Sequence, residues 1–272
     1  METREDHNAP STAVPTFRRV LVGVDASQES LEAARQAATL AEGPITLLSS
    51  YDLAAGLVGG TGPAVPAYLD EEPLKKSAEH AVEAAEAEIG DKPVTGRIAS
   101  GRPWEALLHE IDRWDDTLVA VGSHGTGRAL GIVVGSTATE LIHKAPCSVL
   151  IARTGLGDFP SRIVVGLDGS EEALDAYRTA KAIAERFDAE LEPVVAVADE
   201  DDLDLEAIER AVGENVRRIS DLPVSALVSL SADADLVVVG SRGLKGVKAL
   251  GSVSERVAHQ AASSVLVVRR RP

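Results

Sequence analysis

RRVLVGVDAS (residues 18–27) and SRIVVGLDGS (residues 161–170) are two versions of one segment, and this repetition decides the fold. Two further blocks recur in the same order. LVAVGSHG (118–125) returns as LVVVGSRG (236–243), and CSVLIAR (147–153) returns as SSVLVVR (263–269). Three matched blocks in one order indicate a tandem duplication. The chain of 272 residues is long enough for two ordinary domains, one for each copy.

The matched blocks predict where the domains begin and end. We expect a polar N-terminal tail at residues 1–16 and a first domain at 17–153. A linker at 154–161 then leads to a second domain at 162–272, which is shorter because it lacks residues in its middle and in its glycine-rich loop.

Each half alternates short apolar runs with helical patterns. In the first half the runs rich in β-branched residues predict five strands, at 20–24, 45–51, 94–100, 117–121 and 148–152. Helical patterns lie between them, the first beginning after Ser27 and the others near 73–89, 103–114 and 136–145. Such alternation predicts right-handed βαβ units and a parallel sheet covered on both faces. We therefore expect two five-stranded α/β domains, with a short third strand and a truncated preceding helix in the second.

Composition and charge exclude several kinds of partner. The formal net charge is −16, and a nucleic acid or an anionic membrane surface would need a basic face. No stretch approaches the roughly 18 apolar residues of a membrane-spanning helix. The single cysteine, Cys147, excludes a disulfide within the chain and favours a reducing cytoplasm. We interpret Cys147 as a small buried apolar residue.

A glycine-rich connection follows the fourth predicted strand, in VAVGSHGTGRALGIVVGSTATELI (119–142). Glycine lets a backbone approach a ligand closely, and a helix N-terminus offers unpaired N–H groups to a phosphate. Asp25 ends the first strand and Gly122 ends the fourth, so if these two strands are neighbours in a parallel sheet, both residues face one crevice. A carboxylate beside a glycine-rich loop suits a nucleotide. The alternative is a turn that binds nothing.

The spacing Gly122-x2-Gly125-x9-Gly135-Ser136, together with Asp25, resembles the ATP-binding motif of the universal stress proteins, the UspA-like family. The resemblance extends over both halves. It implies an α/β fold with strand order 3-2-1-4-5, two halves paired within one chain, and ATP, with or without Mg²⁺, as the ligand. It also implies the residues of the first nucleotide site, which are Gly23, Val24, Asp25, Ser50, Val121, Gly122, Gly125, Arg128, Gly135, Ser136 and Thr137.

The second half departs from this pattern. Only seven residues separate Gly243 from Gly251, whereas nine separate Gly125 from Gly135 in the first half. We expect the shorter connection to narrow or reshape the phosphate-binding loop. The resemblance places the corresponding site there at Asp168, Gly240, Gly243, Gly251 and Ser252. The pairs Thr137–Glu140 and Ser252–Glu255 also fit a capping box, so part of the motif is explained by helix initiation alone.

We find no nucleophile–base pair, no fixed general acid and no metal-ligand spacing in the sequence. Binding is therefore expected instead of dedicated catalysis, with slow ATP hydrolysis at most. The resemblance implies a cytoplasmic stress-response protein that senses or signals through an adenine nucleotide. The alternative is an interaction module of the same fold that binds no nucleotide and acts through protein partners. Two chains could also associate as a homodimer.

Overall fold

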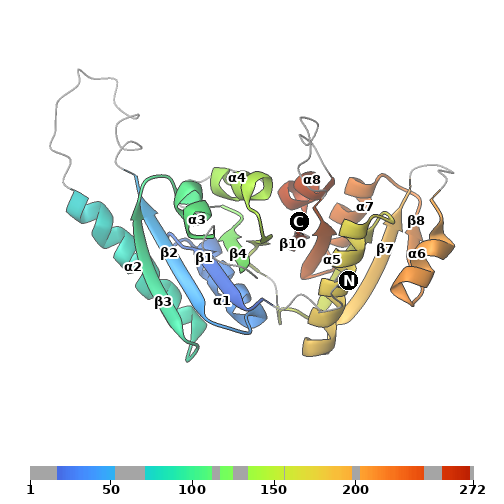
Figure 1. Cartoon of the computed structure of the whole chain (residues 1–272), viewed down its shortest axis with the longest axis horizontal. Helices are drawn as coiled ribbons and strands as arrows, with labels where there is room; N and C mark the ends of the chain where they lie inside the picture. The colour runs from blue at the N-terminus through green and yellow to red at the C-terminus, as the bar shows by residue number, and fades with distance from the viewer. Residues whose placement is uncertain are drawn as a thin grey trace, which may run out of the picture.

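The computed structural model describes residues 17–52, 71–111, 117–124, 134–155, 157–197, 203–241 and 253–269. In these parts of the chain, ten strands form one sheet that is flanked by helices (Figure 1). The strands are β1 (Arg19–Gly23), β2 (Ile45–Tyr51), β3 (Val94–Ser100), β4 (Thr117–Gly122), β5 (Ser148–Ala152), β6 (Arg162–Leu167), β7 (Glu190–Ala196), β8 (Arg217–Ile219), β9 (Leu236–Gly240) and β10 (Ser264–Val268). The helices are α1 (Gln28–Leu40), α2 (Glu71–Ile89), α3 (Pro103–Ile111), α4 (Ser136–Lys144), α5 (Glu171–Phe187), α6 (Leu205–Val212), α7 (Pro223–Leu230) and α8 (Val253–Gln260).

The sheet has the order β3-β2-β1-β4-β5-β10-β9-β6-β7-β8. Each half contributes five parallel strands in the order third, second, first, fourth, fifth, which confirms the predicted fold class. The short third strand of the second half is β8, with three residues, and the truncated helix before it is α6.

Helices cover both faces of the sheet because its strands are apolar on both sides. On one face, α1, α2, α5 and α6 pack over a core that includes Val22, Leu47 and Val238. On the other face, α3, α4, α7 and α8 pack over a second core that includes Leu21, Val119 and Val237. Each core contains residues from both halves of the chain.

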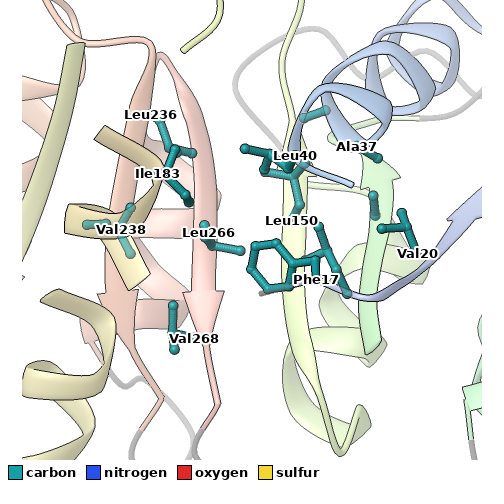
Figure 2. Close-up of a cluster of buried hydrophobic side chains, with 14 of the residues drawn as sticks. Phe17, Val20, Ala37, Leu40, Leu150, Ile183, Leu236, Val238, Leu266 and Val268 are labelled. Carbon is teal, nitrogen blue, oxygen red and sulfur yellow. The ribbon is translucent and has the colours of Figure 1, made fainter. Parts of the chain in front are cut away.

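The two halves meet where β5 and β10 pair antiparallel, with Leu150 opposite Leu266. Figure 2 shows Phe17 beside these two leucines in the core that runs through both halves. Polar contacts also cross this seam in matched pairs. The backbone N–H of Arg153 donates to Ser264 Oγ at 3.0 Å, and that of Arg269 donates to Ser148 Oγ at 3.2 Å.

The same two arginines bind the ends of opposite helices. Arg153 Nη2 donates to the carbonyl of Ala258 in α8 at 2.7 Å, and Arg269 donates in the same way to Ile142 in α4. Burial lowers the pKa of both guanidinium groups, that of Arg153 to about 10. A cation at a helix C-terminus is favourable because the carbonyl groups there are negative. Helices α4 and α8 lie side by side at the centre of the molecule (Figure 1), where His143 Nε2 lies 3.1 Å from Glu255 Oε1.

Candidate functional site

The candidate site lies where β1 and β4 run side by side, because the chain order of the sheet reverses between them. Val22 is paired with Ala120, so both strands end at the same edge of the sheet. The backbone N–H of Val24 donates to the carbonyl of Leu48 at 3.0 Å, which brings the end of β2 to the same edge. A reversal of this kind is where open α/β sheets bind ligands.

The glycine-rich connection leaves the sheet and returns to it at one place. After β4, the backbone N–H of Ser123 donates to the carbonyl of Ala152 at 2.9 Å. The carbonyl of Ser123 in turn accepts from the N–H of Gly135 at 2.7 Å. The start of α4 is therefore tied to the end of β4. Gly125 and Arg128 lie outside the described residues.

Helix α4 begins at the crevice without a side-chain cap. Its N-cap is Gly135, which has extended backbone angles and provides no side-chain hydrogen bond. The predicted capping box is wrong, because Thr137 is the second helical residue and Glu140 instead pairs with Lys144 at 2.7 Å. The first backbone N–H groups of a helix have no partner within it. At α4 the positive end of the helix dipole therefore faces the crevice with no carboxylate or hydroxyl cap of its own.

Asp25 takes part in starting α1. Its Oδ1 accepts from the backbone N–H of Ser27 at 3.1 Å and from Ser27 Oγ at 2.5 Å. Ser27 is the N-cap of α1, and its hydroxyl accepts from the N–H of Ser30 at 3.2 Å. The second half repeats the arrangement with Asp168 and Ser170. One carboxylate oxygen of each aspartate therefore serves helix initiation, a role that the D-x-S spacing signals and that our sequence interpretation missed.

Two glycines of the predicted site are needed for packing. A Cβ atom on Gly122 would come within 2.7 Å of the backbone of Glu29 in the first turn of α1. A Cβ atom on Gly23 would lie 2.9 Å from Leu107 of α3. Gly240 and Gly166 repeat these contacts against Glu172 and Leu227 in the second half. The absence of a side chain at these positions is explained without a ligand.

Three other predicted residues lie at the same edge with different surroundings. The side chains of Val24 and Val121 are buried, one in each core. The Oγ atom of Ser50 is shielded from solvent and has no hydrogen-bond partner among the residues that the structure describes. Buried polar atoms are nearly always paired, so the Ser50 hydroxyl is a candidate contact for a ligand. At Gly135 a Cβ atom would meet nothing closer than 3.6 Å, so packing does not demand glycine there.

Comparison with known proteins gives the context for this geometry. The model of the universal stress protein family matches residues 16–153 and 196–269, which is most of the chain. The chain belongs to the universal stress protein family. The second matched segment begins at the end of β7, so the family pattern is weaker over β6 and α5.

Relatives match this universal stress protein nearly end to end. A universal stress protein of Mycobacterium tuberculosis is 31% identical, and the match covers 92% of this chain and 96% of the relative. Another from Mycolicibacterium smegmatis is 30% identical, with 93% and 97% covered. The crystal structure of a universal stress protein from Archaeoglobus fulgidus has a TM-score of 0.69 at 24% identity, with 94% and 98% covered, and supports the fold.

The second half of this tandem universal stress protein is described in part. Asp168 and Gly240 lie at the ends of β6 and β9, which are neighbours in the sheet as β1 and β4 are. Helix α8 begins at Val253. Gly243, Gly251 and Ser252 lie outside the described residues, so the second predicted capping box and phosphate loop stay predictions.

In the described parts of this universal stress protein, neither Cys147 nor the acidic side chains form a second site. Burial raises the pKa of the Cys147 thiol to about 12, so little reactive thiolate is present at neutral pH. In the acidic run at 199–206, Asp204 caps α6 by accepting from the N–H of Ala207 at 2.9 Å. Among the described residues, no group of three His, Cys, Asp or Glu side chains is placed to hold a metal ion. None of the helices described is long and apolar enough to cross a membrane.

Proposed function

We propose that the first half of the chain binds an adenine nucleotide, ATP with or without Mg²⁺, at the crevice between β1 and β4. The observation that carries this is the start of α4. It has a glycine N-cap, no side-chain cap, and a position at the point where the strand order reverses. A helix N-terminus in such a place is suited to bind phosphate through its backbone N–H groups.

The described residues fit a nucleotide in distinct ways. The N–H groups of Ser136 and Thr137 would hold phosphate oxygens, and the open space at Gly135 lets those oxygens approach. The unpartnered Ser50 hydroxyl and the exposed carboxylate of Asp25 would contact the adenosine part. Mg²⁺ would be carried by the phosphates and water, as it commonly is, because no described cluster of acidic side chains offers it a site.

In this proposal the protein acts in the cytoplasm as a sensor or signalling module of the stress response. Nucleotide occupancy would report the energy state of the cell. The Oγ atom of Ser123 lies 3.1 Å from Nδ1 of the adjacent His124 near the start of α4. The second half has Arg242 in place of this histidine, so turnover is expected to be slow at most. The output would pass to a protein partner.

The test is the thermal shift produced by ATP. A ligand that binds only the native state stabilises it, and at about 100 times its Kd it should raise the Tm by roughly 5 °C or more. Gly135→Val should abolish this shift while the ligand-free Tm stays near wild type, because the added Cβ has space but the methyl groups block the phosphate position. Gly157→Val is the matched control, since no atom lies within 4 Å of a Cβ there. An unchanged ATP shift in Gly135→Val would count against the site.

A second candidate function is an interaction module that binds no nucleotide. It is favoured by the internal roles found for Asp25, Gly23 and Gly122, which explain part of the motif as helix capping and packing. Mass spectrometry of protein purified without added ligand, with stoichiometry measured per chain, separates the two. Bound adenine nucleotide supports the first function, and its absence together with no ATP thermal shift supports the second.

A further inference from the structure

A cavity of about 480 Å³ opens on the second half, between α7 and α8. Its lining is mainly apolar with one cation, and includes Leu222, Val224, Val228, Val253, Arg256 and Gln260. Among the described residues that line it, none carries a negative charge, although acidic residues outnumber basic ones in the chain, 43 to 27. The volume lies in the range of small-molecule sites.

The corresponding region of the first half, between α3 and α4, is filled by side chains. Helices α3 and α7 both begin at a proline and pack a leucine, Leu107 or Leu227, against a glycine of the sheet. By this correspondence Trp104 of α3 is the counterpart of Val224. The closing-strand repeat likewise makes Glu140 and Lys144 of α4 the counterparts of Arg256 and Gln260.

In the first half, Trp104, Glu140 and Lys144 contact one another and fill the space between α3 and α4. Lys144 Nζ lies 3.9 Å from the centre of the Trp104 ring. The same ammonium group pairs with Glu140 Oε2 at 2.7 Å. The space between α3 and α4 therefore holds an aromatic ring, a cation above it and a carboxylate beside the cation.

In the second half the ring and the carboxylate are both missing. Val224 replaces the indole and leaves the space open, while Arg256 puts a positive charge where the first half has Glu140. Arg256 is exposed and makes no ion pair with any described residue. Leu222 and Val253 at the rim are 60% and 40% exposed, and they are two of the three large apolar side chains exposed among the described residues. Exposed apolar groups gathered at a cavity mark a binding site.

The start of α7 adds a second attraction for a negative group. Its N-cap is Leu222, which provides no side-chain hydrogen bond, and Pro223 follows it. The carboxylate of Asp221 accepts from the N–H of Leu222 itself at 2.7 Å, while Leu222 gives no side-chain cap to the N–H groups of the first turn, including that of Ser225. A carboxylate there would be favoured by the helix dipole as well as by Arg256.

We propose that this cavity binds a small, flat aromatic carboxylate. The ring takes the volume that Trp104 occupies in the first half, against Val224, Val228 and Leu222. The carboxylate pairs with the guanidinium group of Arg256, whose planar donors match two carboxylate oxygens. This site lies on the opposite half of the chain from the proposed nucleotide site and does not depend on it.

The experiment uses indole-3-propionate as the probe, titrated into the full-length protein by calorimetry and by amide NMR. We expect saturable binding with chemical-shift changes centred on Val228 and Gln260. Tryptamine has the same ring with a positive charge and should bind at least about tenfold more weakly, as expected for a ligand that depends on a charge-assisted hydrogen bond. Equal binding of the two probes would overturn the proposal.

Two variants locate the site. Arg256→Gln changes an exposed side chain, leaves the Tm unchanged, and should weaken indole-3-propionate about tenfold. Val224→Trp rebuilds the filling of the first half and should abolish binding. Unchanged affinity in Arg256→Gln would contradict the proposal whether or not Val224→Trp folds. Sedimentation that shows an oligomer dissociated by Leu222→Ser would also overturn it, by making this face a contact between copies of the chain.

Discussion

Gly122 illustrates how a residue of a binding motif can be required for packing. The first turn of α1 lies against it, so its hydrogen atom is the only substituent that the space permits. The sequence shows the glycine and its spacing but not the helix that crosses it, because that contact joins segments almost a hundred residues apart. Asp25 was predicted to end the first strand, but β1 ends at Gly23 and Asp25 follows two residues later, where it accepts hydrogen bonds from Ser27.

We therefore predict that Gly122→Ala is destabilising with or without nucleotide. The added methyl group would meet the backbone of Glu29, and overpacking of this kind typically costs about 1–3 kcal/mol of the free energy of unfolding. Urea unfolding measures the loss. Gly157→Ala is the control, because no atom lies within 4 Å of a Cβ there, and it should unfold near the wild-type midpoint. Equal midpoints for wild type and Gly122→Ala would refute the packing role.

At the scale of elements, helices α1, α5 and α4 follow strands in the same way but begin differently. Ser27 and Ser170 cap α1 and α5 with their hydroxyl groups, and an aspartate two residues earlier holds each serine. Helix α4 has a glycine N-cap instead. Strand bounds such as 45–51 and 94–100 were predicted correctly, because the apolar runs and the glycine and proline residues beside them are local features of the sequence. The predicted capping box at Thr137 was wrong because the N-cap of α4 is Gly135, two residues earlier. The S/T-x-x-E pattern alone does not fix the residue at which a helix begins.

This difference predicts which serines support stability. Ser27→Ala and Ser170→Ala each remove an N-cap hydrogen bond and should lower the free energy of unfolding by about 1 kcal/mol. Ser136→Ala changes an exposed first-turn residue that caps nothing, and should alter stability by less than about 0.5 kcal/mol. Chemical denaturation of the three variants without nucleotide gives the comparison. A loss in Ser136→Ala equal to that in Ser27→Ala would show that α4 is capped by its serine after all.

At the scale of the whole molecule, the internal repeat was enough to predict two copies of one α/β unit, and the resemblance to the universal stress proteins implied their strand order. The contacts between the copies could not be predicted in the same way. Arg153 and Arg269 each reach a carbonyl of the opposite half, and a pairing of this kind depends on the antiparallel register of β5 and β10. The cavity beside Val224 depends on how α7 and α8 pack against each other, a contact between segments distant in the sequence. The boundaries of the two domains stay a prediction.

The central claim is that the backbone at the start of α4 holds the phosphates of an adenine nucleotide. A crystal structure of the full chain soaked in excess ATP tests it most directly. We predict a triphosphate within hydrogen-bond distance of the N–H groups of Ser136 and Thr137, with adenosine near Ser50 and Asp25. A well-ordered crevice filled by the protein's own side chains, with no nucleotide bound, would contradict the claim.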